Sequence, residues 1–273
     1  MKFRTEVNIE KPTFSIEPQE RMLFVGSCFA DNIGRRFADE KFRAVVNPYR
    51  VMYNPVSILH TVRRFAATVG PGGYDRLVCV FTLGTNHVYR LIETGEIVDN
   101  CRKRPQNLFR EEELTIDQCA AALAEATAIL GGICRELRVI VTVSPIRYAK
   151  YGFHGSQLSK ATLLLAADKL CRETPCCTYF PAYEIVNDEL RDYRFYKEDM
   201  LHPSDQAVSY IWERFSDLYF SAATKRFLER WRPVREALGH RPFNPESGEY
   251  RLFMERTREK LAALKKDYPL MED

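Results

Sequence analysis

Short runs of consecutive apolar residues alternate along this chain with longer segments in which apolar residues recur every three or four positions. The short runs are typical of strands buried on both faces of a parallel sheet, and they fall at 22–25, 42–46, 77–83, 139–143 and 179–183. The longer segments have the spacing of amphipathic helices, and they fall at 30–41, 56–68, 115–137, 159–172, 204–219, 223–238 and 247–266. This alternation predicts a three-layer α/β/α sandwich with a parallel sheet of about five strands.

Three segments depart from the alternation. The first twenty residues contain Pro12 and Pro18, which predicts an extended arm along the body. Residues 88–98 predict a β-hairpin that turns at Thr94 and Gly95. The last helices are amphipathic and charged, and either the body or a second subunit could cover them. We therefore expect a main domain over 1–222, with the arm, and a helical extension over 223–273.

Ser27 lies at the end of the first apolar run, where the chain turns into a helix. The carboxyl ends of parallel strands are where ligands bind, and the amides that open the next helix attract negative charge. Ser27 is therefore a candidate nucleophile, and its own amide a candidate oxyanion donor. The alternative is that Ser27 only caps the helix, which is common for serine at this position. Cys28 is a second candidate nucleophile, although its position favours packing.

Asp199 and His202 are a candidate partner pair, three residues apart on a turn before a predicted helix. A nucleophilic serine needs a base to accept its proton, and a carboxylate orients that base. His202 is the candidate base and Asp199 the candidate carboxylate. Taken singly, each residue has commoner structural roles; taken with Ser27, the pair predicts a catalytic triad.

Residues 26–30 read Gly-Ser-Cys-Phe-Ala, which resembles the signature of the GSCFA-domain family, a family similar to the SGNH (GDSL-like) hydrolases. The resemblance implies a flavodoxin-like strand order 2-1-3-4-5, and the first, third and last of the SGNH motif blocks have counterparts here in the same chain order. In these blocks Ser27 matches the nucleophile, Asn86 an oxyanion donor beside the Ser27 amide, and Asp199 and His202 the remaining triad members.

The sequence also departs from the SGNH pattern. Arg50 stands where the second block has a glycine donor, and His87 stands where the third block has aspartate. Residues near the expected strand ends are candidate substrate contacts, and they are Arg50, Asn54, His87, Arg147 and His154.

Composition narrows the class of partner. The net charge is only +3, with 40 basic and 37 acidic residues, so we expect no nucleic acid partner. The eight cysteines fall largely within apolar segments, which predicts reduced thiols and no metal site. No glycine-rich phosphate loop follows a strand, so we expect no cofactor. No signal segment or membrane span is evident, and the default expectation is a cytoplasmic protein.

The sequence therefore predicts a serine hydrolase that cleaves O-acyl, acetyl-like esters of a small molecule or a glycan. Two alternatives use the same fold. One is a non-catalytic glycan- or protein-binding module, which the arginine at position 50 favours. The other is an acyltransferase that uses the same three residues and excludes water from its pocket.

Overall fold

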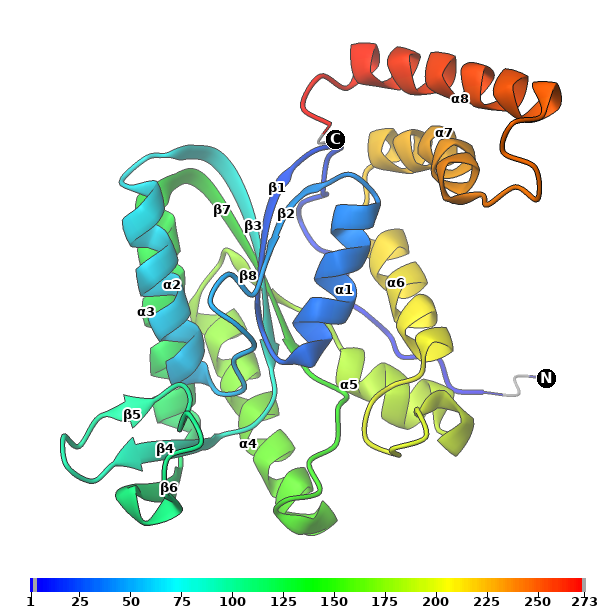
Figure 1. Ribbon diagram of the computed structural model, residues 1–273. Helices are drawn as coiled ribbons and strands as arrows, with labels where there is room; N and C mark the ends of the chain where they lie inside the picture. Colours follow the sequence, from blue (N-terminus) through cyan, green and yellow to red (C-terminus); the bar gives the residue numbers. More distant parts are fainter. Residues whose placement is uncertain (2–3, 272–273) are drawn as a thin grey trace.

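The computed structural model describes residue 1 and residues 4–271. Its main sheet has five parallel strands in the order β2-β1-β3-β7-β8 (Figure 1). Their bounds are Arg43–Val46 for β2, Arg21–Gly26 for β1, Tyr74–Leu83 for β3, Cys134–Val143 for β7 and Cys177–Tyr179 for β8. This order confirms the 2-1-3-4-5 arrangement that the resemblance implied, because the third, fourth and fifth sheet strands of the chain are β3, β7 and β8.

Helices cover both faces of the main sheet, which confirms the three-layer sandwich (Figure 1). One face is covered by α2 (Pro55–Val69), α3 (Ile116–Ile133) and α4 (Gly152–Glu173). The other is covered by α1 (Cys28–Asp39), α5 (Ala182–Glu184), the π-helical turn η2 (Ile185–Leu190) and α6 (Asp205–Tyr219). The short 3₁₀ helix η3 (Tyr193–Phe195) lies between η2 and α6 in the chain.

The apolar run of β1 shows why the strand is buried. Leu23 and Val25 pack into the core under α2 and α3, whereas Met22 and Phe24 pack into the core under α1 and α6. Successive side chains of a strand point to opposite faces, so a strand covered on both sides must be apolar throughout. Gly26, the last residue of β1, therefore lies where the carboxyl ends of the parallel strands meet, and helices cover both faces of this sheet.

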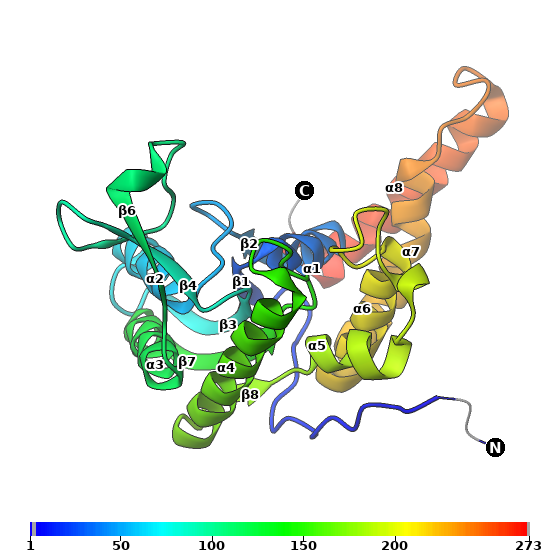
Figure 2. The same cartoon turned by 90° about the horizontal axis from the view of Figure 1, so that it is seen from below.

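A second, smaller sheet lies beside the carboxyl edge of the main one (Figure 2). It consists of the antiparallel strands β4 (His87–Leu91), β5 (Ile97–Val98) and β6 (Phe109–Glu113), with the 3₁₀ helix η1 (Gln106–Leu108) before β6. The β4–β5 pair confirms the predicted hairpin. The sequence analysis missed β6, because three consecutive glutamates give it no apolar alternation.

Three predicted boundaries were wrong. The helix predicted over 115–137 ends at 133, because Cys134–Leu137 extend β7 and pair with the start of β3. The helix predicted from 159 begins at 152, so residues expected to form a loop lie in the first turns of α4. The strand predicted over 179–183 ends at 179, since a helical turn begins at Ala182.

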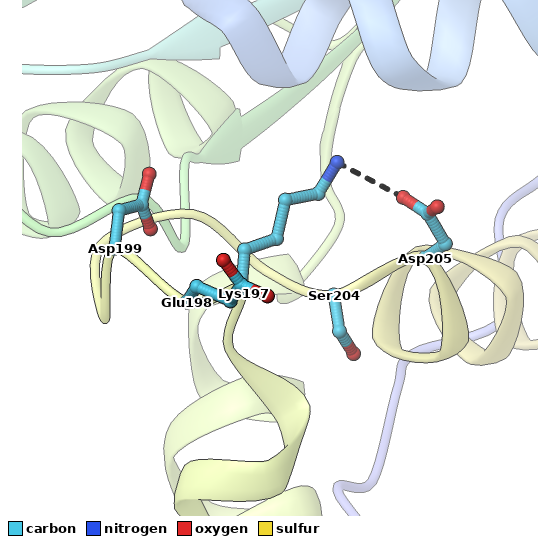
Figure 3. A pocket seen from close by; sticks show the side chains of 5 residues that line it. All are labelled: Lys197, Glu198, Asp199, Ser204 and Asp205. Atoms are coloured by element: carbon cyan, nitrogen blue, oxygen red, sulfur yellow. Dashed lines mark ion pairs between the residues drawn. The ribbon is translucent and has the colours of Figure 1, made fainter.

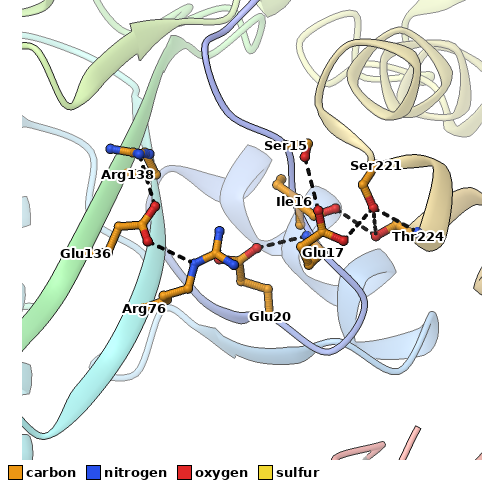
Figure 4. A network of polar contacts seen from close by, with 9 residues as sticks. All are labelled: Ser15, Ile16, Glu17, Glu20, Arg76, Glu136, Arg138, Ser221 and Thr224. Atoms are coloured by element: carbon orange, nitrogen blue, oxygen red, sulfur yellow. Dashed lines mark hydrogen bonds and ion pairs between the residues drawn. The ribbon is translucent and has the colours of Figure 1, made fainter. Parts of the chain in front are cut away.

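The N-terminal arm lies along the body, as predicted, and polar contacts hold it there (Figure 4). Glu20 forms an ion pair with Arg76 of β3 at 3.3 Å, and Arg76 also pairs with Glu136 of β7. Glu17 accepts a hydrogen bond of 2.8 Å from Ser221, just before α7. The arm therefore links the amino ends of the central strands to the C-terminal helices.

The last two helices, α7 (Ala222–Gly239) and α8 (Gly248–Asp267), pack on each other around a small apolar cluster. Trp231 donates a hydrogen bond to the carbonyl of Asp39, which connects α7 to the end of α1. The division of the chain between residues 222 and 223 stays a prediction.

One helix of the described residues, α3, is apolar and long enough to span a membrane by length and composition alone. However, it packs between α2 and α4 and buries Cys119, Leu123 and Leu130 in the core. A buried core helix satisfies the same criterion, so α3 is weak evidence for a span.

Candidate active site

The turn after β1 is fixed by Gly26. Its φ angle is +147°, and a Cβ atom at this position would lie 2.2 Å from the carbonyl oxygen of Thr82 on β3. Only glycine fits such a close backbone approach. The carbonyl of Gly26 accepts the amide of Met52, and its own amide donates to the side chain of Asn47. Hence Ser27 leaves the sheet at a position set by three neighbouring segments.

Ser27 is held by contacts within the fold. Its Oγ atom lies 3.0 Å from Oγ1 of Thr82 and accepts a hydrogen bond from the amide of Phe29. The Ser27 amide donates to the Thr82 carbonyl at 3.0 Å. Its side chain caps α1, and only 1% of the residue surface is exposed. The capping alternative is thus observed, and the amide expected in the oxyanion hole is already used in this conformation.

Asp199 and His202 form the pair that the sequence analysis expected. Nδ1 of His202 lies 2.6 Å from Oδ2 of Asp199, and Oδ1 of Asp199 accepts the amides of Leu201 and His202. These two backbone donors, followed by the imidazole, lower the pKa of Asp199 to about 2. An ionised carboxylate can only accept, so His202 carries its proton on Nδ1. In the neutral imidazole, Nε2 then has the lone pair that a general base needs.

Arg147 ties the loop of this pair to the main sheet. It lies four residues after β7, and its amide donates to the carbonyl of Leu201 at 3.0 Å. Its guanidinium donates to the carbonyl of Met200 and lies over the ring of Phe153. Arg147 was expected to contact substrate. In the structure it instead supports the loop that carries His202, and substrate contact stays a prediction.

Ser27 and His202 do not contact each other in this conformation. Among the described residues, the hydrogen-bond partners of Ser27 Oγ are Thr82 and Phe29. A pocket of about 560 Å³ adjoins Asp199 and is lined also by Lys197, Glu198, Ser204 and Asp205, without Ser27. Figure 3 shows Asp199 apart from the ion pair that Lys197 and Asp205 form at 3.0 Å. Asp199 and His202 are thus paired in this structure, but Ser27 does not contact either of them.

Asn86 follows β3, as expected, but its side chain is directed into the fold. Its Nδ2 atom donates to the carbonyl of Leu114 at 2.9 Å, and its amide donates to Ser159. Its Oδ1 atom is buried without a partner among the described residues. One hydrogen of the side-chain amide remains available, and the oxyanion role of Asn86 stays a prediction.

Tyr148 is a candidate that the sequence analysis missed. Its hydroxyl is buried with no hydrogen-bond partner among the described residues. A Cβ atom on Gly84 would lie 3.4 Å from this hydroxyl and 3.4 Å from Cβ of Ser27, so the two groups flank the same small space. Burial, and then Tyr53 and Cys28, raise the pKa of Tyr148, so the hydroxyl keeps its proton. The Tyr148 hydroxyl is therefore a hydrogen-bond donor beside Ser27 that the fold does not use.

Lys160 is the second residue that the sequence analysis missed. Its Nζ atom is buried and donates to the carbonyls of Gly84, at 2.7 Å, and Ser144, at 2.8 Å. The amine thereby joins the carboxyl ends of β3 and β7. Burial lowers the pKa of Lys160 to about 7. A lysine on the apolar face of α4 was the available signal, because a buried lysine usually has a specific partner.

The other predicted contacts lie in different surroundings. Asn54 accepts the amide of Ser57 and caps α2. His87 stacks on Tyr151 with the ring centroids 3.6 Å apart, and burial lowers its pKa. His154 is exposed in the first turn of α4. The structure does not gather these three side chains around Ser27, and their contact with substrate stays a prediction.

The described residues contain no group of three or more histidine, cysteine or acidic side chains that could hold a metal ion. All eight cysteines lie within these residues, and none forms a disulfide.

A comparison with protein-family models decides the family. Residues 21–70 and 74–215 match the GSCFA family, which is more than half of the chain. The chain belongs to the GSCFA family. Residues 231–272 match the C-terminal domain of GSCFA domain proteins. The GSCFA signature is the Gly26–Ala30 segment described above, so the residues that name the family are those that hold the serine turn. No curated protein sequence matches the chain.

Three solved structures with a distant likeness to this GSCFA protein are described as esterases or a lipase. An acetylxylan esterase from Geobacillus stearothermophilus has 13% identity and a TM-score of 0.49, and the match covers 76% of this chain and 98% of that one. A GDSL-like lipase from Bacteroides thetaiotaomicron has 15% identity and a TM-score of 0.44, with 78% and 89% covered. A family 3 carbohydrate esterase from Clostridium thermocellum has 10% identity and a TM-score of 0.42, with 72% and 96% covered.

Proposed function

We propose that this protein is a serine hydrolase of O-acyl esters, in which Ser27 is the nucleophile, His202 the base and Asp199 its orienting carboxylate. The observation that carries the proposal is the Asp199–His202 pair. The carboxylate holds the proton on Nδ1 of the imidazole and leaves Nε2 free to accept one, which is the arrangement that a serine nucleophile requires.

Catalysis requires the serine hydroxyl to exchange its bond with Thr82 for one with His202. The exchange replaces one hydrogen bond of the hydroxyl by another, so its main cost is that of bringing the two side chains into contact. His202 is the partner in this exchange, and its side chain is 38% exposed. After the proton passes to Nε2, Oγ attacks the ester carbonyl, and His202 then protonates the leaving alcohol. Water hydrolyses the acyl-enzyme with His202 again as base.

The oxyanion in this reaction needs donors that the fold does not already use. Tyr148 offers a buried, protonated hydroxyl on the space beside Ser27. The amide of Cys28, the first in α1, has no hydrogen-bond partner among the described residues. A helix amino terminus favours the negative charge that forms there. We propose these two donors, together with Asn86, for the oxyanion.

A fluorophosphonate probe tests the proposal directly, because it labels a serine only when a neighbouring base activates that serine. We expect the wild-type protein to be labelled and the Ser27→Ala and His202→Gln variants to remain unlabelled. The Cys28→Ala variant should still be labelled, which excludes the neighbouring thiol as the reactive group. Absence of labelling in folded wild-type protein would refute the hydrolase.

A non-catalytic binding module is the second candidate, and the burial of Ser27 favours it. A serine that caps a helix and bonds to Thr82 has a complete structural role without catalysis. An acyltransferase uses the same residues as the hydrolase. Product analysis with an ester donor and a sugar acceptor distinguishes acyl transfer from hydrolysis. Fluorophosphonate labelling at Ser27 distinguishes either enzyme from a non-catalytic binding module.

A further inference from the structure

A large cavity lined by basic side chains lies beside the serine turn. Its volume is about 1100 Å³. One wall is the loop of residues 48–52 that follows β2, and another is the loop of residues 98–104 that follows β5 in the small sheet. We call it the basic cavity, after the five cationic side chains that line it, which are Arg50, Arg64, Arg102, Lys103 and Arg104.

These five cations lack acidic partners. Among the residues that the structure describes, no carboxylate oxygen forms an ion pair with any of them, although many other basic side chains of the chain are paired. The one carboxylate in the lining is Asp99, and it already bonds Nδ1 of His60 at 2.8 Å. Like charges gathered in a concave surface repel each other and attract anions.

The backbone holds three of these side chains in a conformation that few residues adopt. The φ angle is +88° at Arg50, +51° at Arg102 and +58° at Lys103. Positive φ costs a residue with a Cβ atom about 1 kcal/mol or more, and glycine or asparagine would avoid most of it. Strained positions of this kind are concentrated at binding sites. Here three of the positive-φ residues line one cavity and all three are cationic.

Two aromatic rings orient the arginines. The guanidinium of Arg64 lies 3.9 Å from the ring centroid of Tyr49, and that of Arg104 lies 5.6 Å from the ring centroid of Phe109. A stacked guanidinium keeps its N–H edges free for carboxylate or phosphate oxygens.

The wall of the basic cavity is bonded to the serine turn. The amide of Met52 donates to the carbonyl of Gly26 at 2.8 Å. The next residue, Tyr53, accepts the amides of Gly84 and Thr85 from the end of β3. One continuous segment therefore forms a wall of the basic cavity and bonds to the backbone on both sides of the serine turn.

We propose that the basic cavity binds an acidic oligosaccharide and so presents an acyl ester of the same chain to Ser27. Five separate cations over about 1100 Å³ suit a chain with charges on successive units better than a single phosphate. This inference deepens the proposed function, on which its catalytic part rests, because it names the class of substrate. The binding part is independent and can be measured without turnover.

Binding is tested with a fluorescent tetragalacturonate, which carries four carboxylates, and the Ser27→Ala protein. We expect fluorescence polarisation to report binding that weakens as salt rises from about 50 to about 200 mM, because the contacts are between solvated charges. The double variant Arg102→Asn/Lys103→Asn should bind at least about 10-fold more weakly. Asparagine tolerates positive φ, so this variant removes charge without adding strain.

A matched pair of variants on α2 controls for nonspecific charge effects. Arg64→Gln removes a cavity cation and should weaken binding about 10-fold, a loss of roughly 1.4 kcal/mol. Arg63→Gln removes the adjacent cation, which pairs with Glu125 at 2.5 Å outside the cavity, and should leave binding unchanged.

Several outcomes would overturn the proposal. Equal affinity of all the variants would show that the basic cavity is not the site. Equally tight binding of a neutral oligosaccharide, or of inorganic phosphate, would reject a polyanionic chain. Tighter binding of a single-stranded DNA oligomer would make nucleic acid the partner. Failure of fluorophosphonate labelling would refute the hydrolase and leave the binding result intact.

Discussion

Oδ2 of Asp199 lies 2.6 Å from Nδ1 of His202, and the two residues belong to a single turn of the chain. Backbone amides bind the other carboxylate oxygen, so the carboxylate cannot rotate without losing two further bonds. The imidazole is thereby fixed in tautomer and direction before any substrate arrives. This preorganisation distinguishes the pair from a surface salt bridge that orders only one contact.

The Asp199→Asn variant tests the value of this orientation. Its side-chain oxygen can still accept the backbone amides, but its nitrogen cannot accept from Nδ1–H of His202. The imidazole then favours the wrong tautomer. We expect hydrolysis of p-nitrophenyl acetate to fall by a factor on the order of 10² to 10⁴, with the melting temperature nearly unchanged. An unaltered rate would remove Asp199 from the mechanism.

The same carboxylate predicts a pH response. Two backbone amides and His202 lower the pKa of Asp199 from 3.8 to about 2. A depressed carboxyl pKa means that its stabilising contribution is complete above about pH 4 and disappears as the pH falls through 2. Carboxyl ¹³C NMR should show Asp199 still ionised at pH 3. Titration near pH 4 would indicate that the turn is open in solution.

Gly26→Ala should be severely destabilising. The new methyl group would lie 2.2 Å from the Thr82 carbonyl oxygen, on a backbone with φ of +147°. We expect the free energy of unfolding to fall by about 3 kcal/mol or more in urea denaturation. Gly131→Ala is the matched control, since its Cβ meets nothing within 4 Å in α3. It should raise stability by about 0.5 to 1 kcal/mol.

Tyr148→Phe should affect catalysis and stability in opposite directions. Loss of an oxyanion donor should lower kcat by roughly 100-fold with little change in KM. Removing a buried hydroxyl without a partner should leave the unfolding free energy unchanged or raise it by up to about 1 kcal/mol. A parallel loss of stability and activity would instead indicate a packing role for Tyr148.

Lys160 predicts a pH-dependent stability. Its pKa falls from 10.5 to about 7 on folding, so between these values the unfolded chain binds the extra proton. The free energy of unfolding should therefore rise with pH in this window, by up to about 1.4 kcal/mol per pH unit. Urea denaturation at pH 7, 8 and 9 measures the slope. The Lys160→Met variant should lack it, and equal slopes would show that the amine stays charged.

The sequence predicted the parts of the fold that depend on local patterns. Continuous apolar runs identified the sheet strands, and the resemblance supplied their order. The pattern could not locate β6, which contains three consecutive glutamates, or the end of α3, because Cys134–Leu137 suit either a helix or a strand. Residues 134–137 form a strand because they pair with β3, and pairing between segments distant in the sequence cannot be recognised from the local pattern.

The candidate site likewise has a part that the sequence predicted and a part that it did not. Asp199 and His202 are three residues apart, and their contact could be predicted because one turn contains both. The bond from Ser27 to Thr82 of the adjacent strand could not be predicted in this way, since the two residues are 55 positions apart in the sequence. The contributions of Tyr148 and Lys160 arise from packing across the sheet edge, where no spacing in the sequence indicates them.

The bond from Met52 to the carbonyl of Gly26 has a mechanical consequence. Any ligand that draws the 48–52 loop toward the basic cavity also pulls on the peptide immediately before Ser27. A charged ligand that shifts this loop therefore acts on the backbone that positions Ser27, and a neutral ester that never contacts the loop does not.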